Sequence, residues 1–212
     1  MTLNCKSPDD VLKAIKDNDI KHVDLRFTDP RGKLQHLTQW HTTIEEDVFE
    51  DGFMFDGSSI AGWKVINESD MTLQLDIETA VMDPFAAEPT MIITCDVHDP
   101  ISGQPYERCP RSVAKAAEKH MKSVGVGDTA FFGPEAEFFV FDDVRYATDM
   151  NNMSYKVDSN EGPYNSYAKF ADGNTGHRPP VKGGYFPVPP VDSAQDMRSE
   201  MVSVMAQMGL DV

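Results

Sequence analysis

The chain has 212 residues, of which 40% are hydrophobic, so it can bury a sizeable core in one large or two small domains. Its 35 acidic and 19 basic residues give a formal net charge of −16. This excess argues against a nucleic-acid or anionic-membrane partner, because a surface that binds phosphate groups must be locally basic.

The three cysteines, Cys5, Cys95 and Cys109, lie far apart and form no CxxC pair. An odd number of scattered cysteines argues against a disulfide framework. The first ten residues contain no basic start followed by an apolar stretch, and no run reaches membrane-spanning length. We therefore expect reduced thiols and a cytoplasmic protein.

The N-terminal half predicts one helix followed by paired strands. Ser7 is a helix cap, Pro8 lies in the first turn, and Asp10 completes a capping box. Alternating apolar residues predict strands over 22–29, 33–40, 71–81 and 90–97, the first two joined by a turn at 29–32. Residues 1 to about 99 therefore predict a small α+β unit whose strands form hairpins.

The C-terminal half is less regular. A helix is expected over 110–123 with Gly125 as its stop, then a strand over 131–143, and a last helix that ends at Gly209. Between 142 and 191 the periodicity disappears, and a connection of that length is either functional or disordered. Residues 210–212 read as the start of another strand, which predicts a truncation at Val212.

Glu135 and Glu137 lie at the centre of the apolar run FFGPEAEFFVFDD. In a strand, residues two apart project from the same face, with about 6.5 Å between their α-carbons. Two buried carboxylates on one face need a cation or a shared proton, and carboxylate oxygens suit Mg²⁺ or Mn²⁺. The alternative is a solvent-exposed sheet face that carries two acids, and the residues alone favour neither interpretation strongly.

A second candidate region is the glycine-rich loop that follows Asp56. The sequence FDGSSIAGWKVINESDM combines turn-forming residues with Trp63 and with two acids, Glu68 and Asp70. An isolated DGSS would be an ordinary surface turn. The tryptophan and the acids favour a functional loop instead.

Three segments together carry a family resemblance: FDGSSIAGWKVINESDM, FGPEAEFFVFD and GNTGHRPPVKGGYFPVPPVDSAQDMRSEM. In this order and spacing they closely resemble the bacterial type I glutamine synthetases. The length of the central loop resembles the subgroup regulated by adenylylation, whose modified tyrosine would lie beyond Val212. The resemblance implies an α+β fold: a β-grasp-like domain over 1–105, then the truncated start of the catalytic domain over 106–212.

The resemblance implies ligation of ammonia to L-glutamate through γ-glutamyl phosphate, with ATP as substrate and two divalent cations, Mg²⁺ or Mn²⁺, at each site. Glu137 matches a ligand of the ion that positions glutamate, and Glu135 a ligand of the ion that holds the nucleotide phosphates. Asp56 matches the catalytic aspartate that binds ammonium and takes its proton. Ser59 and Tyr185 match groups around the ammonium pocket.

The resemblance also implies a homo-oligomer, a dodecamer of two hexameric rings, in which the Asp56 loop reaches the neighbouring subunit. Trp63, Glu68 and Asp70 would lie at that subunit boundary. Ala136 stands where relatives often have proline. The further metal ligands and the nucleotide pocket would lie beyond Val212, so we expect weak metal affinity and no synthetase activity from these residues alone.

Two other functions stay open at this point. The chain could be a non-catalytic β-grasp assembly module, with its carboxylates exposed on the surface. It could also belong to a related glutamate–amine ligase, although an aspartate at position 56 favours ammonia over bulkier amines.

Overall fold

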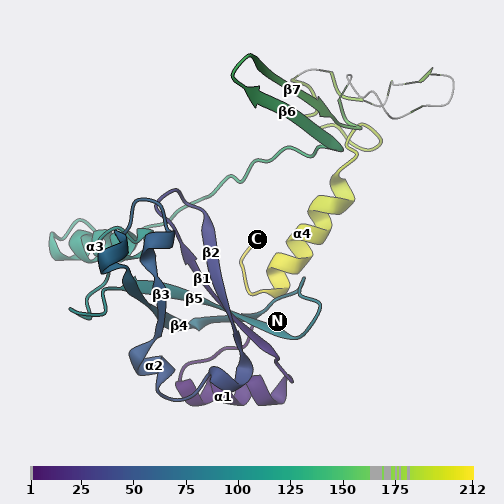
Figure 1. Ribbon diagram of the computed structural model, residues 1–212. Coiled ribbons are helices and arrows are strands. Elements are labelled where there is room, and N and C mark those ends of the chain that lie inside the picture. Colours follow the sequence, from purple (N-terminus) through teal and green to yellow (C-terminus); the bar gives the residue numbers. More distant parts are fainter. Residues whose placement is uncertain (1, 163–168, 170–172, 175, 177, 181) are drawn as a thin grey trace. The chain divides into compact units, whose positions relative to one another are not determined.

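The computed structural model describes residues 2–162, 169, 173–174, 176, 178–180 and 182–212. The chain divides into two compact units, one of residues 1–131 with 204–212 and one of residues 132–203 (Figure 1). The helices and strands, in chain order, are α1 (Pro8–Asp17), β1 (His22–Thr28), β2 (Leu34–Trp40), α2 (Val48–Asp51), β3 (Phe53–Asp56), β4 (Asp70–Met82), β5 (Thr90–His98), α3 (Pro110–Ser123), β6 (Asp143–Asp149), β7 (Asn152–Asp158) and α4 (Gln195–Gln207).

The first unit is built on a five-stranded sheet in the order β2-β1-β5-β4-β3. β1 runs parallel to β5, and the other neighbouring pairs are antiparallel. The predicted β1–β2 hairpin is confirmed, with Leu25 opposite Leu37. The parallel contact places β1 beside β5, a long-range pairing that no local pattern in the sequence indicates.

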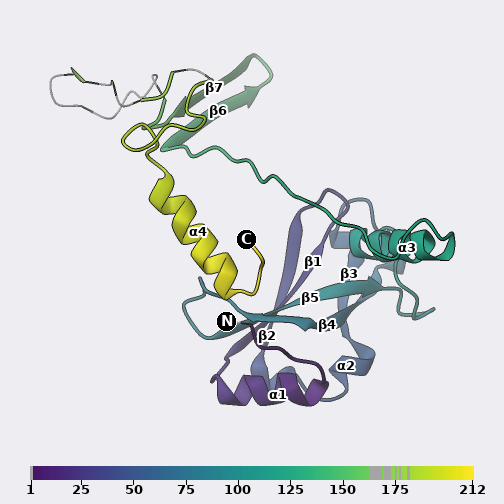
Figure 2. The ribbon, with the colours of Figure 1, turned by 180° about the vertical axis from the view of Figure 1, so that it is seen from behind.

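One face of this sheet carries the core. Alternate residues such as Leu25, Leu73 and Ile93 are fully buried, as is Val11 of α1, and Val48 of α2 is largely buried. Figures 1 and 2 show α1 and α2 beside each other, and α3 apart from both. The capping box predicted for α1 is present, since the Asp10 amide donates to the Ser7 hydroxyl and the Ser7 amide donates to the Asp10 carboxylate.

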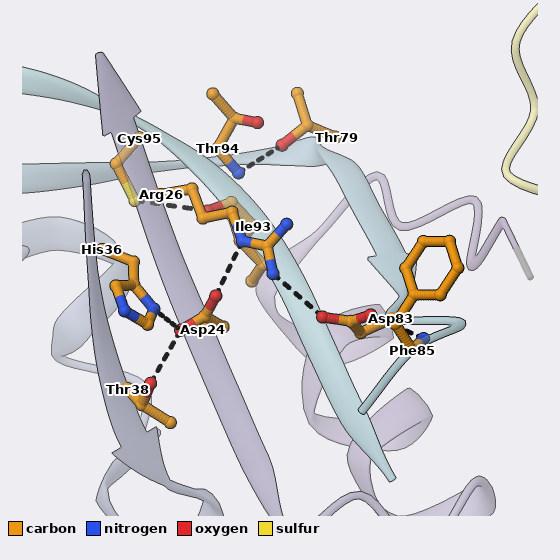
Figure 3. A network of polar contacts seen from close by, with 10 residues as sticks. All are labelled: Asp24, Arg26, His36, Thr38, Thr79, Asp83, Phe85, Ile93, Thr94 and Cys95. Carbon is orange, nitrogen blue, oxygen red and sulfur yellow. Dashed lines mark hydrogen bonds and ion pairs between the residues drawn. The ribbon is translucent and has the colours of Figure 1, made fainter. Parts of the chain in front are cut away.

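The opposite face of the sheet is polar and is organised around Asp24, which is only 4% exposed (Figure 3). Its carboxylate accepts hydrogen bonds from Arg26 Nε at 2.7 Å and Thr38 Oγ1 at 2.7 Å, and His36 Nδ1 lies 2.6 Å away. Arg26 also donates to Asp83 at 2.9 Å. Burial acts to raise the pKa of Asp24, but the hydrogen bonds from Arg26, Thr38 and His36 outweigh it and hold that pKa below its usual value.

Helix α3 is attached to the same polar face by ion pairs. Arg111, in its first turn, donates to Asp96 and Asp76, and Lys115 one turn later also donates to Asp96. The expected end of this helix is confirmed, because Gly125 adopts a positive φ of 72° just beyond it. The three cysteines are free thiols, as predicted.

The second unit contains a hairpin, β6–β7, that the sequence analysis missed when it assigned no regular structure to 142–191. Tyr146 lies opposite Tyr155 in this hairpin, and both side chains are exposed. The last helix, α4, is confirmed, and Gly209 follows it with a φ of 89°. The strand expected at residues 210–212 is not formed, because none of the described strands pairs with this segment.

Among the described residues, no helix has both the length and the apolar character that a membrane crossing requires.

Candidate functional site

Asp56 is the last residue of β3, opposite Asp70 on β4, and the turn that follows wraps around its carboxylate. The Ser58 amide and the Ser58 hydroxyl both donate to Asp56 Oδ1, at 2.8 and 2.6 Å. The Ser59 hydroxyl donates to Asp56 Oδ2 at 3.3 Å. Two of the residues predicted to form the ammonium site, Asp56 and Ser59, are therefore brought together.

The exposed Asp56 carboxylate is stabilised in its ionised form. The hydrogen bond from the Ser58 hydroxyl and the one from the Ser58 amide hold the pKa of Asp56 below its ordinary value, and the hydroxyls of Ser59 and Ser69 add to the effect. Ser58 was not among the predicted site residues. Aspartate side chains in turns accept a hydrogen bond from the backbone amide two residues on, so the turn at Asp56 was the signal that could have identified Ser58.

Gly57 is the point at which this turn touches the core. A Cβ at this position would lie 2.5 Å from the sulfur of Met71 and 3.0 Å from the carbonyl oxygen of Ser69. The Gly57 amide donates to that same carbonyl at 2.7 Å. The backbone that carries Asp56 is therefore fixed against β4 by packing and by a hydrogen bond.

Trp63 anchors the rest of the loop. It is only 5% exposed, its ring stacks on Phe27 with centroids 5.7 Å apart, and the Tyr106 hydroxyl donates to its carbonyl at 3.0 Å. Trp63 therefore packs inside its own unit. The two acids of the loop, Glu68 and Asp70, are exposed.

The strand predicted over 131–143 is wrong for most of its length. Residues 129–141 form neither helix nor strand, and Glu135 and Glu137 are exposed. A strand needs a neighbour for its backbone hydrogen bonds, and none of the described strands pairs with this segment. Its phenylalanines are also uncovered, with Phe131 92% and Phe139 87% exposed.

Glu135 and Glu137 remain chemically suited to a divalent cation. Among the described residues, neither carboxylate makes an ion pair or hydrogen bond, so both are available as oxygen ligands. The described part of the chain nevertheless contains no cluster of three or more histidine, cysteine, aspartate or glutamate side chains placed to hold a metal. Carboxylate oxygens are suitable ligands for Mg²⁺ or Mn²⁺, and two carboxylates fill only part of the coordination shell of such an ion.

Tyr185 lies in the second unit, as Glu135 and Glu137 do, and its side chain is 85% exposed. Its ring contacts that of Phe186, with centroids 4.2 Å apart. The motif around it includes residues 175, 177 and 181, which lie outside the described residues. Asp56 and Ser59 belong to the first unit.

Comparison with known proteins gives two matches to family models. The model described as "Glutamine synthetase, beta-Grasp domain" matches residues 19–100, and the model described as "Glutamine synthetase, catalytic domain" matches residues 107–212. These matches agree with the expected α+β fold, a β-grasp domain followed by the start of a catalytic domain.

Individual relatives agree with these matches. Glutamine synthetase of Azospirillum brasilense is 68% identical over 202 residues, which cover 95% of this chain and 43% of the relative. A protein of Cupriavidus pinatubonensis named 3-hydroxylaminophenol mutase is 55% identical over 203 residues, 96% of this chain and 43% of that protein. This chain therefore spans less than half the length of the relatives that it matches.

The fold is also that of a solved structure. Glutamine synthetase of Plasmodium falciparum superimposes with a TM-score of 0.83, at 23% identity, over 100% of this chain and 42% of that one. At this identity the likeness concerns the fold alone.

Proposed function

The chain belongs to the glutamine synthetase family, and from this premise we propose that it is the N-terminal part of an enzyme that ligates ammonia to L-glutamate at the expense of ATP. The observation that best supports the proposal is the Asp56 turn, where Ser58 and Ser59 hold an exposed carboxylate in its anionic form. We propose the domain boundary at residues 105/106, with the β-grasp domain before it.

The proposed reaction has two steps. An oxygen of the glutamate γ-carboxylate attacks the γ-phosphorus of ATP, the bond to the bridging oxygen breaks, and ADP leaves. Ammonia then attacks the carbonyl carbon of γ-glutamyl phosphate, phosphate leaves with its electron pair, and one proton is released. The overall change is L-glutamate, ammonium and ATP to L-glutamine, ADP, phosphate and a proton.

Asp56 would serve the second step. Ammonium, with a pKa of about 9, predominates at neutral pH, so the site must hold a cation and then lose a proton before the nitrogen can attack. An anionic carboxylate attracts the cation, and a carboxylate oxygen can receive the proton. Ser59 beside Asp56 Oδ2 and the exposed Tyr185 are the groups that we propose complete the ammonium pocket.

Glu135 and Glu137 would serve the first step. Phosphoryl transfer between two anions depends on charge neutralisation and alignment, which bound Mg²⁺ or Mn²⁺ supplies. We propose Glu137 as a ligand of the ion near glutamate and Glu135 as a ligand of the ion near the nucleotide phosphates. The exposed phenylalanines beside them support burial of this segment by other parts of the complete protein, because large exposed apolar stretches mark contact surfaces.

The assembly proposed for this family also suits the exposed acids of the loop. We propose a cytoplasmic homo-oligomer, a dodecamer of two rings of six, in which Glu68 and Asp70 approach a neighbouring subunit while Trp63 anchors the loop from inside. Regulation by adenylylation would act on a tyrosine outside residues 1–212.

One observation favours a second candidate, a non-catalytic assembly module. The described residues hold only two carboxylates at the predicted metal site and no cluster of three donors. The two candidates differ in what the complete protein does, since only the enzyme couples glutamate and ammonia to ATP cleavage. A related glutamate–amine ligase would do the same with a bulkier amine.

The experiment that tests the proposed function uses a completed chain, in which residues 1–212 are followed by the remaining C-terminal part of the Azospirillum brasilense relative. We expect glutamine and phosphate in equal amounts, dependent on ATP, glutamate, ammonium and Mg²⁺. Residues 1–212 alone should give no glutamine above background. Glutamine formation by residues 1–212 alone, or none by a folded completed chain, would contradict the proposal.

A further inference from the structure

We propose that Ser58 is the positioning residue for Asp56: it occupies Oδ1 and leaves Oδ2 as the oxygen that meets ammonium. This inference rests on the proposed function, because it assigns roles to the two oxygens of the carboxylate that would hold ammonium. It adds a residue, Ser58, to the Asp56, Ser59 and Tyr185 already proposed for the pocket.

The two oxygens of the Asp56 carboxylate are hydrogen-bonded asymmetrically. Oδ1 accepts two short bonds, 2.8 Å from the Ser58 amide and 2.6 Å from the Ser58 hydroxyl. A carboxylate oxygen has two lone pairs in the carboxylate plane, so two short donors occupy that oxygen. Oδ2 accepts a longer contact, 3.3 Å from the Ser59 hydroxyl, which leaves room for a further donor, and the Ser69 hydroxyl also interacts with the carboxylate.

Ser58 is itself held in place by the backbone of its turn. It sits in a single turn of 3-10 helix, Gly57–Ser59, whose first residue packs on Met71 without room for a side chain. The Gly57 amide donates to the carbonyl of Ser69, the residue just before β4. The Ile60 amide donates to the Gly57 carbonyl at 3.2 Å. A donor on a fixed backbone fixes the rotation of the carboxylate that it binds.

Ser58 also affects the charge of Asp56. Its hydroxyl is the leading cause of the lowered pKa of Asp56, followed by its amide, and both act against burial, which would raise that pKa. Ser58 therefore both orients the carboxylate and keeps it anionic, which a cation-binding oxygen requires.

A second aspartate of this unit, Asp99, is also held by a serine, three residues later instead of two, and provides a control. Asp99 Oδ1 accepts from the Ser102 amide at 2.9 Å and from the Ser102 hydroxyl at 3.2 Å. The backbone bond from Ser102, followed by the contact with Lys64, lowers the pKa of Asp99 to about 2. Replacing Ser102 removes a serine hydroxyl from an aspartate that has no part in the proposed pocket.

The first experiment measures the pKa of the Asp56 carboxyl by NMR in the 212-residue chain. In Ser58→Ala it should rise toward the usual aspartate value of about 3.9. In Ser58→Thr, which keeps the hydroxyl, it should stay below that value. Ser102→Ala should leave the Asp56 pKa unchanged. An unchanged Asp56 pKa in a folded Ser58→Ala protein would overturn the inference.

The second experiment measures ammonium kinetics in the completed chain. Ser58→Ala should raise the KM for ammonium by roughly 10-fold, the size expected for loss of one hydrogen bond to a charged group, with little change in the KM for ATP. Ser58→Thr should restore most of the affinity, and Ser102→Ala should behave as wild type. A uniform loss across all substrates in Ser58→Ala would indicate a structural role and reject the positioning role.

The variant Asp56→Asn distinguishes a failure of the positioning role of Ser58 from a failure of the proposed function. If Asp56→Asn raises the KM for ammonium and Ser58→Ala does not, the positioning role of Ser58 is wrong and the proposed function stands. If Asp56→Asn leaves ammonium use unchanged, the role of Asp56 in the proposed function is itself wrong.

Discussion

Gly57 and Met71 are in direct contact: a Cβ on Gly57 would lie 2.5 Å from the Met71 sulfur and 2.7 Å from its Cγ. Met71 is fully buried in the core of the first unit, so its side chain has little space into which it can move. The turn that orients Asp56 is thus a continuation of core packing. The position of the proposed ammonium-binding carboxylate depends on a glycine that the turn chemistry alone would not require.

Gly57→Ala should therefore destabilise the first unit. We expect a loss of about 1–3 kcal/mol in the free energy of unfolding, the range for overpacking a filled core. Urea unfolding monitored by tryptophan fluorescence is the measurement, since Trp63 is buried in this unit. Gly133→Ala is the control, because nothing lies within 4 Å of a Cβ there. Equal stability of the two variants would refute the tight contact.

Asp24 should make the stability of the first unit depend on pH. Its folded-state pKa is lowered, so its contribution is present above the unfolded-state pKa of about 3.9 and is lost as pH falls through the folded value. Asp24→Asn should cost roughly 1–3 kcal/mol near pH 7, because Arg26 and Thr38 lose an anionic acceptor. This difference should shrink as the pH falls below about 4.

Thermal or urea unfolding of both proteins from pH 7 to pH 3 measures that difference. Asp17→Asn is the comparison, since Asp17 is exposed and should change stability by less than about 0.5 kcal/mol. An Asp24→Asn effect that stays constant over the whole range would show that the charge of Asp24 is not involved.

Glu135 and Glu137 should bind Mn²⁺ weakly in the 212-residue chain. Two carboxylates without further protein ligands give an affinity no tighter than roughly 0.1–1 mM, near the weak end of oxygen-ligand sites. Paramagnetic broadening of NMR signals around Ala136 in about 0.15 M salt is the measurement, because salt suppresses diffuse attraction to the chain's net charge of −16.

The variant Glu135→Gln combined with Glu137→Gln should abolish this local broadening. Glu107→Gln, at another exposed glutamate, should leave it intact. Broadening that persists around Ala136 in the double variant would show that these two side chains are not the ligands.

Much of the first unit could be predicted from sequence because its signals are local. The alternation in β1, β4 and β5 reflects one buried face, and the capping box of α1 involves residues only three apart. β3 has only four residues and is defined by pairing with β4, so its own sequence carries little signal. Asp56 was predicted as a site residue from the turn residues beside it, but its position at the end of a strand was not predicted.

The second unit was predicted less well. The strands β6 and β7 are largely exposed, but their sequences DVRYATD and NMSYKVD alternate apolar with polar residues, a local signal that was overlooked. The polar residues between Thr148 and Met153 were the available sign of a hairpin turn. Segment 131–143 has the composition of a buried strand, but composition cannot provide the neighbouring strand that its backbone needs.

Positional isotope exchange in the completed chain tests the central claim most directly. ATP labelled with ¹⁸O at the β-nonbridging oxygens scrambles its label when the γ-phosphoryl group moves reversibly to glutamate, even without ammonia. We predict that Asp56→Asn keeps glutamate-dependent scrambling but loses glutamine formation, whereas Glu137→Gln loses both. Loss of scrambling in Asp56→Asn, or wild-type scrambling in Glu137→Gln, would contradict the division of roles between the two carboxylates.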